Sequence, residues 1–351
     1  MQFKKSDIEL RKNKYNTLNE KLSYLSNNSI KMMIRPDKND ENIKWGLTKI
    51  FDFNKQKIFI KVIPIAKLFA KDENHLNSAN LYKLPAFYHY GIGSAGINPW
   101  RELLLHIKTT NYVLTDTFHN FPILYHYRVV EDDNNDNIKS GLTEKLLNRW
   151  DNNKNIIKYL KDRSKSKYKI VLFLEYIPYV GRQYLLEKPD FIKPFHEATK
   201  KIVTFMNKNG ILHCDSHLAN YIIDDKENVY ITDFGLSLDK EFDLDKGEKR
   251  FMKMNKKLDV FYTIDIIMAN YFQRCVRNQI IEARYELKKC NTTQLIQILI
   301  DNIDVIKSDL KMNRFQYNFI KKNKNKIMKY SDMIKNFENS KNKKNHFINP
   351  V

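Results

Sequence analysis

The chain has 351 residues, of which 42% are hydrophobic and 13% aromatic, and a formal net charge of +20. This length can bury one large or two small cores, and the aromatic content argues against disorder. The three cysteines have no metal-site or disulfide spacing, and no apolar run reaches the roughly 18 residues of a bilayer span. Because a signal-peptide core is also missing, we expect a soluble cytoplasmic protein with no disulfide or transmembrane partner.

The excess of positive charge raises the question of a nucleic-acid partner. Lysines are scattered along the chain, with local concentrations at 320–330 and 341–344, and asparagine, isoleucine and tyrosine are abundant too. This composition is typical of an A/T-rich coding sequence. We therefore do not expect nucleic acid to be the primary partner, and attraction to acidic substrates or anionic surfaces stays open as a secondary effect.

The front of the chain predicts a helix followed by strands. A loose apolar stripe predicts a helix over residues 5–25. Three strand-like runs follow, with polar turns between them, at 29–35, 42–53 and 57–66. A glycine-rich loop at 91–96 then leads to a helix with Asn98 as its N-cap and Pro99 in its first position.

Two further strands are predicted at 121–130 and 169–177. Between them lies a polar, mostly looped insertion at 131–167 with one helix at 142–150. The back of the chain is helix-rich, with predicted helices at 194–209, 256–289 and 293–330. A strand-rich front and a helix-rich back predict an α+β chain with two lobes.

This order divides the chain into four expected parts. Residues 1–28 form an N-terminal helical extension, and 29–177 a lobe built on a small antiparallel sheet. Residues 178–335 form a mainly helical lobe, and 336–351 a basic tail that we expect to be disordered.

The segment 210–237 carries the most informative motif. It places His213, Asp215 and Asn220 in the order H-x-D-x-x-x-x-N, and Asp233-Phe234-Gly235 begins 13 residues after the asparagine. Two short strand runs, NYII and VYIT, bracket a turn between the two motifs. A polar hairpin would explain the strands but not these identities at these offsets. The spacing resembles the catalytic loop and the metal-binding D-F-G of protein kinases.

Phosphoryl transfer depends mainly on positioning and on neutralising charge, which explains the residue types. Asp215 would orient the acceptor hydroxyl and accept its proton. Asp233 would hold magnesium against the triphosphate, and Asn220 would offer a neutral oxygen to a second metal. His213 is grouped with the catalytic residues, although packing that holds the loop is the expected role of such a histidine.

Other parts of the kinase pattern can be matched upstream. Lys61 in IFIKVI resembles the strand lysine of V-A-I-K, which would reach the α- and β-phosphates. Glu102, in the first turn of the helix after Asn98, is the candidate to pair with it. The alternatives are an ordinary edge lysine and a glutamate placed for the helix dipole.

The run VLFLEYI resembles the hinge between kinase lobes. The resemblance implies that Leu174 lies at the back of an adenine pocket and that backbone groups of Glu175 and Ile177 pair with the adenine edge. The run KKLDVFYTIDIIM resembles the D-V-W-S-x-G helix, in which Asp259 would brace the catalytic loop from behind.

The glycines fit the pattern less well. A phosphate-covering loop should precede the strand lysine, where only Gly46 is present. A full G-x-G-x-x-G occurs later, as Gly91, Gly93 and Gly96, with no strand before it of the kind that dinucleotide sites need. We expect this loop either to clamp phosphate or to form a tight turn that aims the helix.

The resemblance to the protein-kinase-like superfamily covers about residues 30–300. YGIGSAGINPWREL and HCDSHLANYIID further look like divergent serine/threonine kinases of large DNA viruses, the poxvirus virion kinase group included. The resemblance implies a bilobal fold, ATP with Mg²⁺ or Mn²⁺ as cofactors, and a protein substrate. A viral kinase would act in the host cytoplasm and in the virion.

Three departures from the family pattern leave alternatives open. Cys214 replaces an arginine that binds activation-loop phosphate in many kinases, and no A-P-E lies between Asp233 and Asp259. His217, grouped with the catalytic residues, stands where serine/threonine kinases usually carry lysine and is similar to small-molecule kinases of the aminoglycoside and choline type. A small-molecule kinase and a pseudokinase scaffold therefore remain as alternatives.

Overall fold

The computed structural model describes residues 3–35, 46–91, 93–132 and 143–340. The chain is α+β and divides into two compact units. The sheet unit comprises Gln2–Ile177 and Thr232–Lys249, and the helical unit comprises Met1, Pro178–Ile231 and Arg250–Val351. Among the described residues, no helix combines the length and apolar character needed to cross a membrane.

The sheet unit is built on four antiparallel strands in the order β1-β2-β4-β3. They are β1 (Leu47–Phe53), β2 (Gln56–Pro64), β3 (Leu124–Glu131) and β4 (Tyr168–Glu175). In β2, Ile58, Ile60 and Val62 are buried, and the alternation of a strand places Lys61 on the opposite face. The strands predicted at 57–66, 121–130 and 169–177 are confirmed. Of the run 42–53, residues 42–45 lie outside the described residues.

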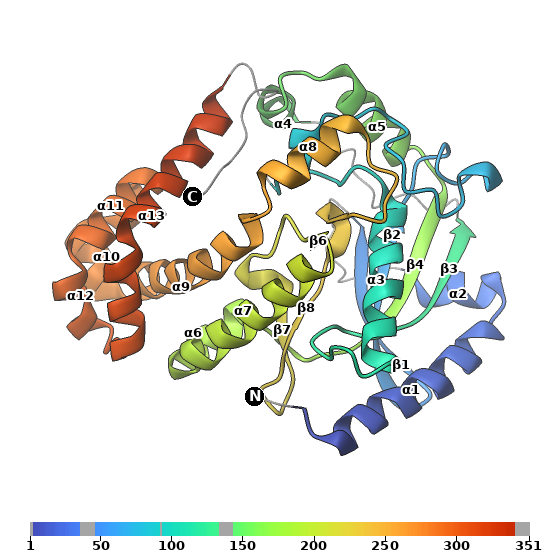
Figure 1. The fold of residues 1–351 in the computed structure, drawn as a ribbon, viewed down its shortest axis with the longest axis horizontal. Coiled ribbons are helices and arrows are strands. Elements are labelled where there is room, and N and C mark those ends of the chain that lie inside the picture. The colour runs from blue at the N-terminus through green and yellow to red at the C-terminus, as the bar shows by residue number, and fades with distance from the viewer. Residues whose placement is uncertain (1–2, 36–45, 92, 133–142, 341–351) are drawn as a thin grey trace. The chain divides into compact units, whose positions relative to one another are not determined.

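Helix α3 (Pro99–Leu114) lies across this sheet, and α1 (Lys5–Ser23) and α2 (Asn27–Met33) lie beside β3 (Figure 1). The predicted start of α3 is confirmed, because the Asn98 side chain accepts a hydrogen bond from Trp100 N (2.9 Å) and Pro99 follows it. This cap fixes the helix register and therefore where Glu102 stands.

The strand predicted at 29–35 is wrong, because α2 occupies most of it. Ser26 caps this helix by accepting from Ser29 N (3.1 Å), and Ile30 and Met33, three residues apart, form its buried face. The short apolar run therefore follows helical rather than strand spacing.

The insertion at 131–167 is more helical than predicted. The expected helix at 142–150 is present as α4 (Glu144–Arg149), and a second helix, α5 (Lys154–Ser164), follows it. The buried residues of α5 have the spacing of one helix face: Ile156, Tyr159, Leu160 and Arg163. Residues 133–142 of this insertion lie outside the described residues.

The helical unit carries a three-stranded sheet in the order β5-β7-β8 and most of the helices. The strands of this sheet are β5 (Tyr179–Val180), β7 (Tyr221–Ile223) and β8 (Val229–Ile231), and the unit also contains β6 (Ile211–Leu212), which is not part of this sheet. Its helices are α6 (Gly181–Glu187), α7 (Ile192–Lys208), α9 (Leu258–Arg277), α10 (Gln279–Tyr285), α11 (Thr292–Asp301), α12 (Ile303–Asp309) and α13 (Arg314–Asn339). β9 (Leu238–Asp239) belongs to the sheet unit, and α8 (Lys246–Met254) spans the division between the units.

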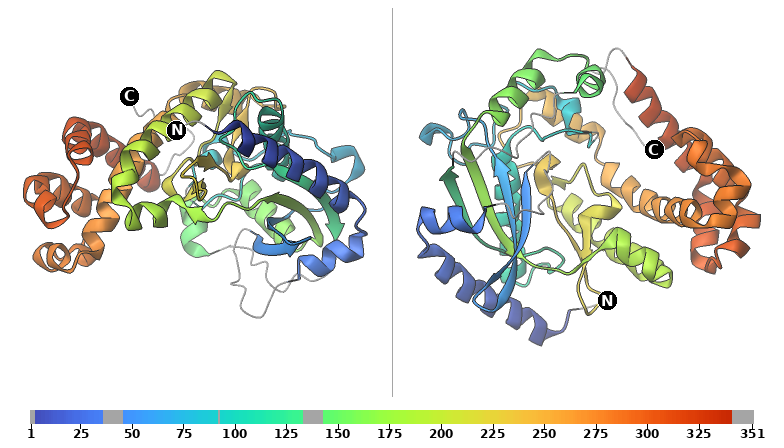
Figure 2. Two further views of the ribbon diagram at one scale, coloured as in Figure 1. Left: turned by 90° about the horizontal axis from the view of Figure 1, so that it is seen from below. Right: turned by 180° about the vertical axis from the view of Figure 1, so that it is seen from behind.

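Within the helical unit, α7 packs against α9, and α13 lies alongside α11 (Figure 2). The helices predicted at 194–209, 256–289 and 293–330 are confirmed, as are the two strands between the motifs. The tail is shorter than expected, because α13 continues to Asn339. Residues 341–351 lie outside the described residues.

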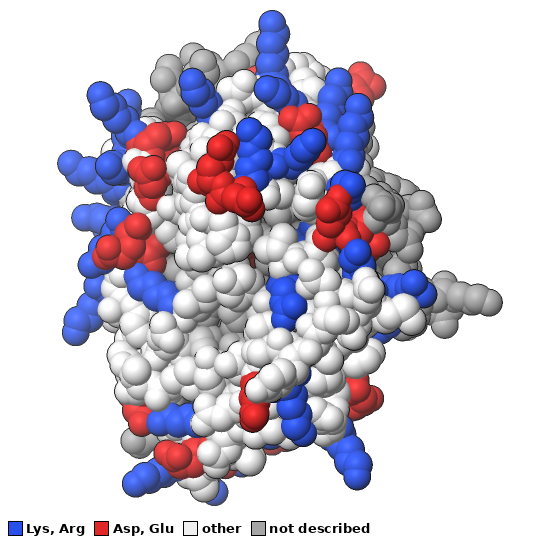
Figure 3. All heavy atoms as spheres, turned by 90° about the vertical axis from the view of Figure 1, so that its right-hand side faces the viewer, with Lys and Arg blue, Asp and Glu red and all other residues white. Residues whose placement is uncertain are grey.

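On the face of the molecule in Figure 3, positive and negative charges are mixed. On the face in Figure 3, lysine and arginine side chains are spread widely, and acidic side chains lie among them. This distribution agrees with the scattered lysines of the sequence.

Candidate active site

The sheet unit brings together three side chains that the sequence places far apart. Lys61 Nζ on β2 donates to Glu102 Oε1 on α3 (2.5 Å) and to Asp233 Oδ1 (2.8 Å). The partners lie 41 and 172 residues from the lysine in sequence. The pairing of Lys61 with Glu102 that the motif order predicted is present.

The surroundings of Lys61 keep it charged. Burial lowers the pKa of Lys61, but the carboxylates of Asp233 and Glu102 outweigh burial and raise it above its ordinary value. Glu102 is only 5% exposed, whereas 46% of the Asp233 side chain is exposed. Of the two carboxylates, Asp233 is therefore the one that solvent or a ligand can reach.

Asp233 is held in an unusual backbone conformation, with φ +67°. Non-glycine residues at positive φ are uncommon, and such strain is typically stored at functional sites. The next residue, Phe234, is fully buried and packs edge-on against the His106 ring of α3 (5.0 Å between centroids). The packing of Phe234 therefore fixes the position of the backbone that carries Asp233.

The later glycine loop packs against the same motif. Gly96 has φ +77°, and a Cβ there would lie 2.3 Å from the carbonyl oxygen of Gly235. Gly93 has the same φ, but a Cβ there would meet only side-chain atoms of Leu146 and Arg149. Of the two roles expected for Gly91, Gly93 and Gly96, this geometry favours the tight turn, because Gly96 lets two backbone segments touch.

Close packing also explains why residue 46 is a glycine. A Cβ at this position would lie 2.3 Å from the carbonyl oxygen of Val62 on β2. The close approach of the chain to β2 therefore requires glycine there, whatever else the neighbouring residues do.

The segment predicted to be a hinge ends β4 and is tied to α1. Arg11 donates to both carboxylate oxygens of Glu175 (2.9 and 2.7 Å), and also to the carbonyl oxygen of Phe121 (2.6 Å). Glu175 N–H donates to Ile123 O (2.8 Å), so this N–H is not available to an adenine ring. Leu174 is buried, and Ile177 is the last residue before the helical unit.

In the helical unit, Asp259 at the start of α9 holds the loop that carries the other motif. It accepts hydrogen bonds from His213 N (2.6 Å), Cys214 N (3.1 Å) and Ser216 Oγ (3.1 Å). Asp259 is fully buried, and Cys214 adopts φ +65°. The expected brace behind the loop is therefore present, and the loop it holds is strained.

Asp215 lies at the accessible end of this loop, and Asn220, which is only 7% exposed, contacts it from the inside. Asn220 Nδ2 donates to the backbone oxygen of Asp215 (2.8 Å) and to its Oδ2 (3.2 Å). His217 Nε2 lies 3.7 Å from the same Oδ2, and the His217 side chain is 38% exposed. The Asn220 amide donates with its nitrogen, so Oδ1 is the atom it would offer to a metal.

His213 differs from its neighbours because its ring has no exposed surface. Its Nδ1 accepts from Asp215 N (3.3 Å). A buried ring cannot touch a substrate, so grouping His213 with the catalytic residues needs correction: it positions the loop.

The predicted residues thus fall into two sets, each described within its own unit. Lys61, Glu102 and Asp233 meet in the sheet unit, and Asp215, Asn220 and Asp259 meet in the helical unit. Sequence reasoning missed two buried ion pairs of the sheet unit, Arg11–Glu175 and Arg101–Glu248. Their partners lie 164 and 147 residues apart, so no local pattern signals them.

A pocket of about 940 Å³ opens elsewhere in the sheet unit, next to α5. Exposed lysines line it from several segments: Lys67, Lys71, Lys83, Lys158, Lys165 and Lys167. Asp162 is the carboxylate among them, and Tyr82 donates to it (3.0 Å). The described lining residues include no predicted site residue, so we do not connect this pocket with the motifs.

No family model matches the chain, and no curated protein is similar enough to be counted as a relative. What the protein does must therefore be inferred from its own residues and their contacts.

Proposed function

We propose that the protein is an ATP-dependent phosphotransferase with a bilobal, protein-kinase-like fold and that its acceptor is a serine or threonine hydroxyl of a protein. The observation that carries this proposal is the contact of Lys61 with both Glu102 and Asp233. Three segments that lie far apart in the sequence supply these residues, which the motif order assigns to nucleotide and metal binding. An ordinary edge lysine would not need two carboxylate partners from distant segments.

The second set of residues supports the proposal independently. Asp215 stands on a loop that Asp259 holds through several hydrogen bonds, and the Asp215 side chain is 18% exposed. A carboxylate with one face fixed and one face accessible suits a group that orients a hydroxyl and accepts its proton.

The donor atoms suit magnesium, or manganese in its place. Among the described residues, no group of three or more His, Cys, Asp or Glu side chains is arranged to hold a metal ion. Mg²⁺ beside phosphates usually takes one or two protein ligands and completes its shell with phosphate oxygens and water. Asp233 and Asn220 offer the required carboxylate and amide oxygens, and the bound ion would neutralise charge on the phosphates.

The hairpin joins these two ligands along the chain. β7 and β8 pair Tyr221 with Ile231. Asn220 directly precedes this pair, and Asp233 follows it by two residues. The hairpin therefore fixes the number of residues that separate these two ligands along the chain.

The alternative acceptor is a small molecule. His217 beside Asp215 is the observation that favours it, because histidine at this position is similar to small-molecule kinases. The segment between Asp233 and Asp259 is also short and contains no A-P-E, so it would offer a peptide substrate little surface for docking. The two acceptors require the same residues for phosphoryl transfer, so only acceptor identification separates them.

The test compares the wild-type protein with Asp215→Asn in a phosphotransfer assay with labelled ATP, Mg²⁺, protein mixtures and small hydroxyl compounds. We expect the substitution to lower kcat by about 10²–10⁴-fold, the usual contribution of a general base, and to leave ATP binding nearly intact. Asp225→Asn, in the exposed turn of the same hairpin, should stay within about twofold of wild type. Near-normal turnover of Asp215→Asn would refute the assignment, and label found only on small hydroxyl compounds would replace the protein acceptor.

Nucleotide binding separates the enzyme from a scaffold. Mg-ATP should raise the melting temperature of the wild-type protein and of Asp215→Asn, because a ligand of the folded state stabilises it. Asp233→Ala should lose the magnesium-dependent part of this shift. A pseudokinase scaffold would show no shift or one that is independent of the metal.

A further inference from the structure

The segment that follows Asp233 is locked to α3 by a fully buried ion pair. Arg101 Nη1 donates to Glu248 Oε1 (2.5 Å), and Nη2 donates to Oε2 (3.1 Å). Arg101 is 1% exposed and Glu248 is not exposed at all. Charges this deep persist only when they are paired with good geometry, because each pays a large desolvation penalty.

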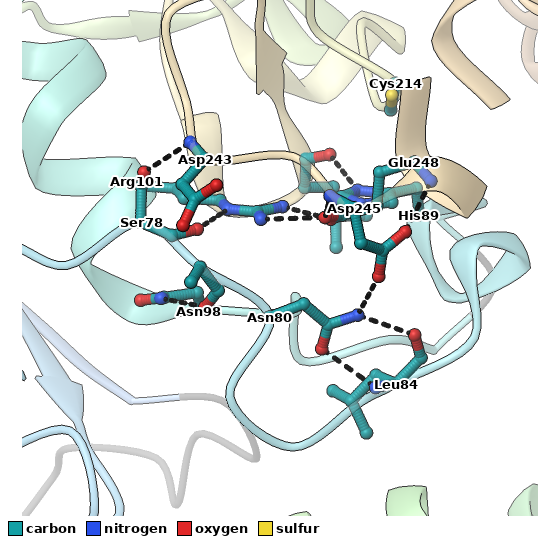
Figure 4. Close-up of polar contacts among 12 residues, drawn as sticks. Ser78, Asn80, Leu84, His89, Asn98, Arg101, Cys214, Asp243, Asp245 and Glu248 are labelled. Atoms are coloured by element: carbon teal, nitrogen blue, oxygen red, sulfur yellow. Dashed lines mark hydrogen bonds and ion pairs between the residues drawn. The ribbon is translucent and has the colours of Figure 1, made fainter. Parts of the chain in front are cut away.

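Further contacts make this pair part of a network. His89 lies between Glu248 Oε1 (3.1 Å from Nε2) and the carbonyl oxygen of Leu236 (3.0 Å from Nδ1). Arg101 Nε donates to Ser78 O (2.8 Å), and Asp243 N donates to the hydroxyl of Ser78 (2.8 Å). Figure 4 shows these groups converging from the loop around residue 80, from α3 and from the segment before α8.

A second ion pair ties α3 to the same segment. Lys108, two turns further along α3, contacts Asp239 on β9 at 2.6 Å, and the Asp239 side chain is 1% exposed. Glu102 lies between these two tethers and directly follows Arg101 in the chain. The position of Glu102 beside Lys61 therefore depends on the segment that the tethers hold.

The same segment offers almost nothing to phosphorylate. Between Asp233 and Asp259 the sequence contains a single hydroxyl residue, Ser237, and that residue is 1% exposed. Cys214 also provides no cation for a phosphate. Kinases that order this segment by phosphorylation do so by creating a new anion–arginine pair. Here Glu248 supplies the anion from the start.

We propose that Glu248 and Arg101 are positioning residues whose buried pair sets α3 and Glu102, so that the enzyme is active without phosphorylation of residues 234–258. This inference rests on the phosphotransferase proposed above and concerns its regulation. The contact of Glu102 with Lys61 would then always be present, and the rate of phosphoryl transfer would depend on the supply of substrate and nucleotide.

Glu248→Gln tests the ion pair with Arg101 separately from the second role of Glu248, which is to cap helix α8. Asp245 N donates to Glu248 Oε2 (3.1 Å) and Glu248 N donates to Asp245 Oδ1 (2.8 Å), which is a capping box at the start of α8. Glutamine satisfies a capping box as well as glutamate does, so the substitution removes the charge and keeps the cap. The matched control is Asp132→Asn, which removes a carboxylate from an ion pair with Lys169 (2.6 Å) away from α3.

The experiment measures kcat, the KM for ATP and amide hydrogen exchange of residues 100–108, with wild-type protein also treated with a phosphatase. We expect Glu248→Gln to lower kcat by at least about tenfold, as when the tethered state falls to a tenth of the population, and to speed exchange in α3. Asp132→Asn should change kcat by less than about twofold and leave α3 exchange unchanged. Phosphatase-treated wild type should keep its activity and carry no phosphate on 234–258.

The inference is overturned if Glu248→Gln matches Asp132→Asn in kcat and in α3 exchange. It is also overturned if wild type carries phosphate on 234–258 and loses its activity when the phosphatase removes that phosphate. A wild-type protein that transfers no phosphate would instead defeat the proposed function. In that case α3 exchange still decides whether the pair holds the helix: faster exchange in Glu248→Gln supports the tether, and unchanged exchange refutes it.

Discussion

Replacing Gly96 by alanine should disturb the D-F-G motif from a distance of 139 residues in sequence (235 minus 96). A Cβ at Gly96 would lie 2.3 Å from the carbonyl oxygen of Gly235, closer than the 3.0 Å that real Cβ contacts reach. The two backbone segments would have to separate by at least 0.7 Å, the difference between these distances. Since Gly235 is two residues from Asp233, the Asp233 carboxylate would move with it.

Gly93→Ala provides the matched control. Both glycines have φ +77°, so an alanine at either pays the same positive-φ penalty of about 1–2 kcal/mol. At Gly93 the nearest atoms are the ends of the Leu146 and Arg149 side chains, at 3.1 and 3.5 Å, which can move aside. At Gly96 the obstacle is backbone, and overpacking of this kind costs a further 1–3 kcal/mol or so. Gly96→Ala should therefore be less stable than Gly93→Ala by about 1–3 kcal/mol.

Urea denaturation of both variants measures the stability difference, and a phosphotransfer assay well below the melting temperature measures the functional one. We expect Gly96→Ala to lose kcat in addition to stability and Gly93→Ala to keep its kcat. Equal stability losses together with equal kcat values would refute the close approach of the two loops.

Three further predictions concern buried charges. Lys61→Met should cost about 2–4 kcal/mol of stability, because Glu102 is left as a buried anion. Adding Glu102→Gln should restore most of that stability in urea denaturation. A double variant that is less stable than the single one would contradict the pairing. Despite burial, hydrogen bonds from its neighbours lower the pKa of Glu248 from 4.5 to about 2. This lowered pKa contributes about 3 kcal/mol of stability, which is present above pH 5 and is lost as the pH falls toward 2. Glu248→Gln should lack this acid-dependent loss when unfolding is measured as a function of pH. A loss equal to that of wild type would refute the pKa shift. Arg11→Met should cost about 2–4 kcal/mol in thermal or urea denaturation, because its carboxylate partner is mostly buried. Lys12→Met should cost much less, because its partner is 57% exposed, and equal costs would contradict this difference in burial.

The local features of this chain could be predicted from its sequence. The cap at Asn98, the strand that carries Lys61 and the hairpin between Asn220 and Asp233 each depend on residues within a few positions of one another. Such patterns reflect backbone sterics and side-chain periodicity, which act over short stretches. They were misread where apolar runs are short, as in α2, and overlooked where an amphipathic helix lies in a polar insertion, as in α5.

The motif residues were also identifiable in advance, because chemistry restricts which side chains can do a task and at what spacing. The motif order predicted that Glu102 should pair with Lys61, and their contact in the sheet unit agrees. The contact of Lys61 with Asp233 was not predicted and came from the structure. What the motif order left open was the role of the glycines at 91–96. Their role became clear only from the distance between Gly96 and Gly235.

Only the tertiary structure decided the partners of Arg101, Arg11 and Asp259. Each belongs to a contact between segments at least 43 residues apart, and nothing in the flanking sequence distinguishes these side chains from other charged residues. Their pairing follows from how helices, strands and loops pack, since a charge taken out of water must find a partner wherever packing delivers it. The sequence by itself therefore determined which residues carry the proposed chemistry, and the fold determined which residues hold them in place.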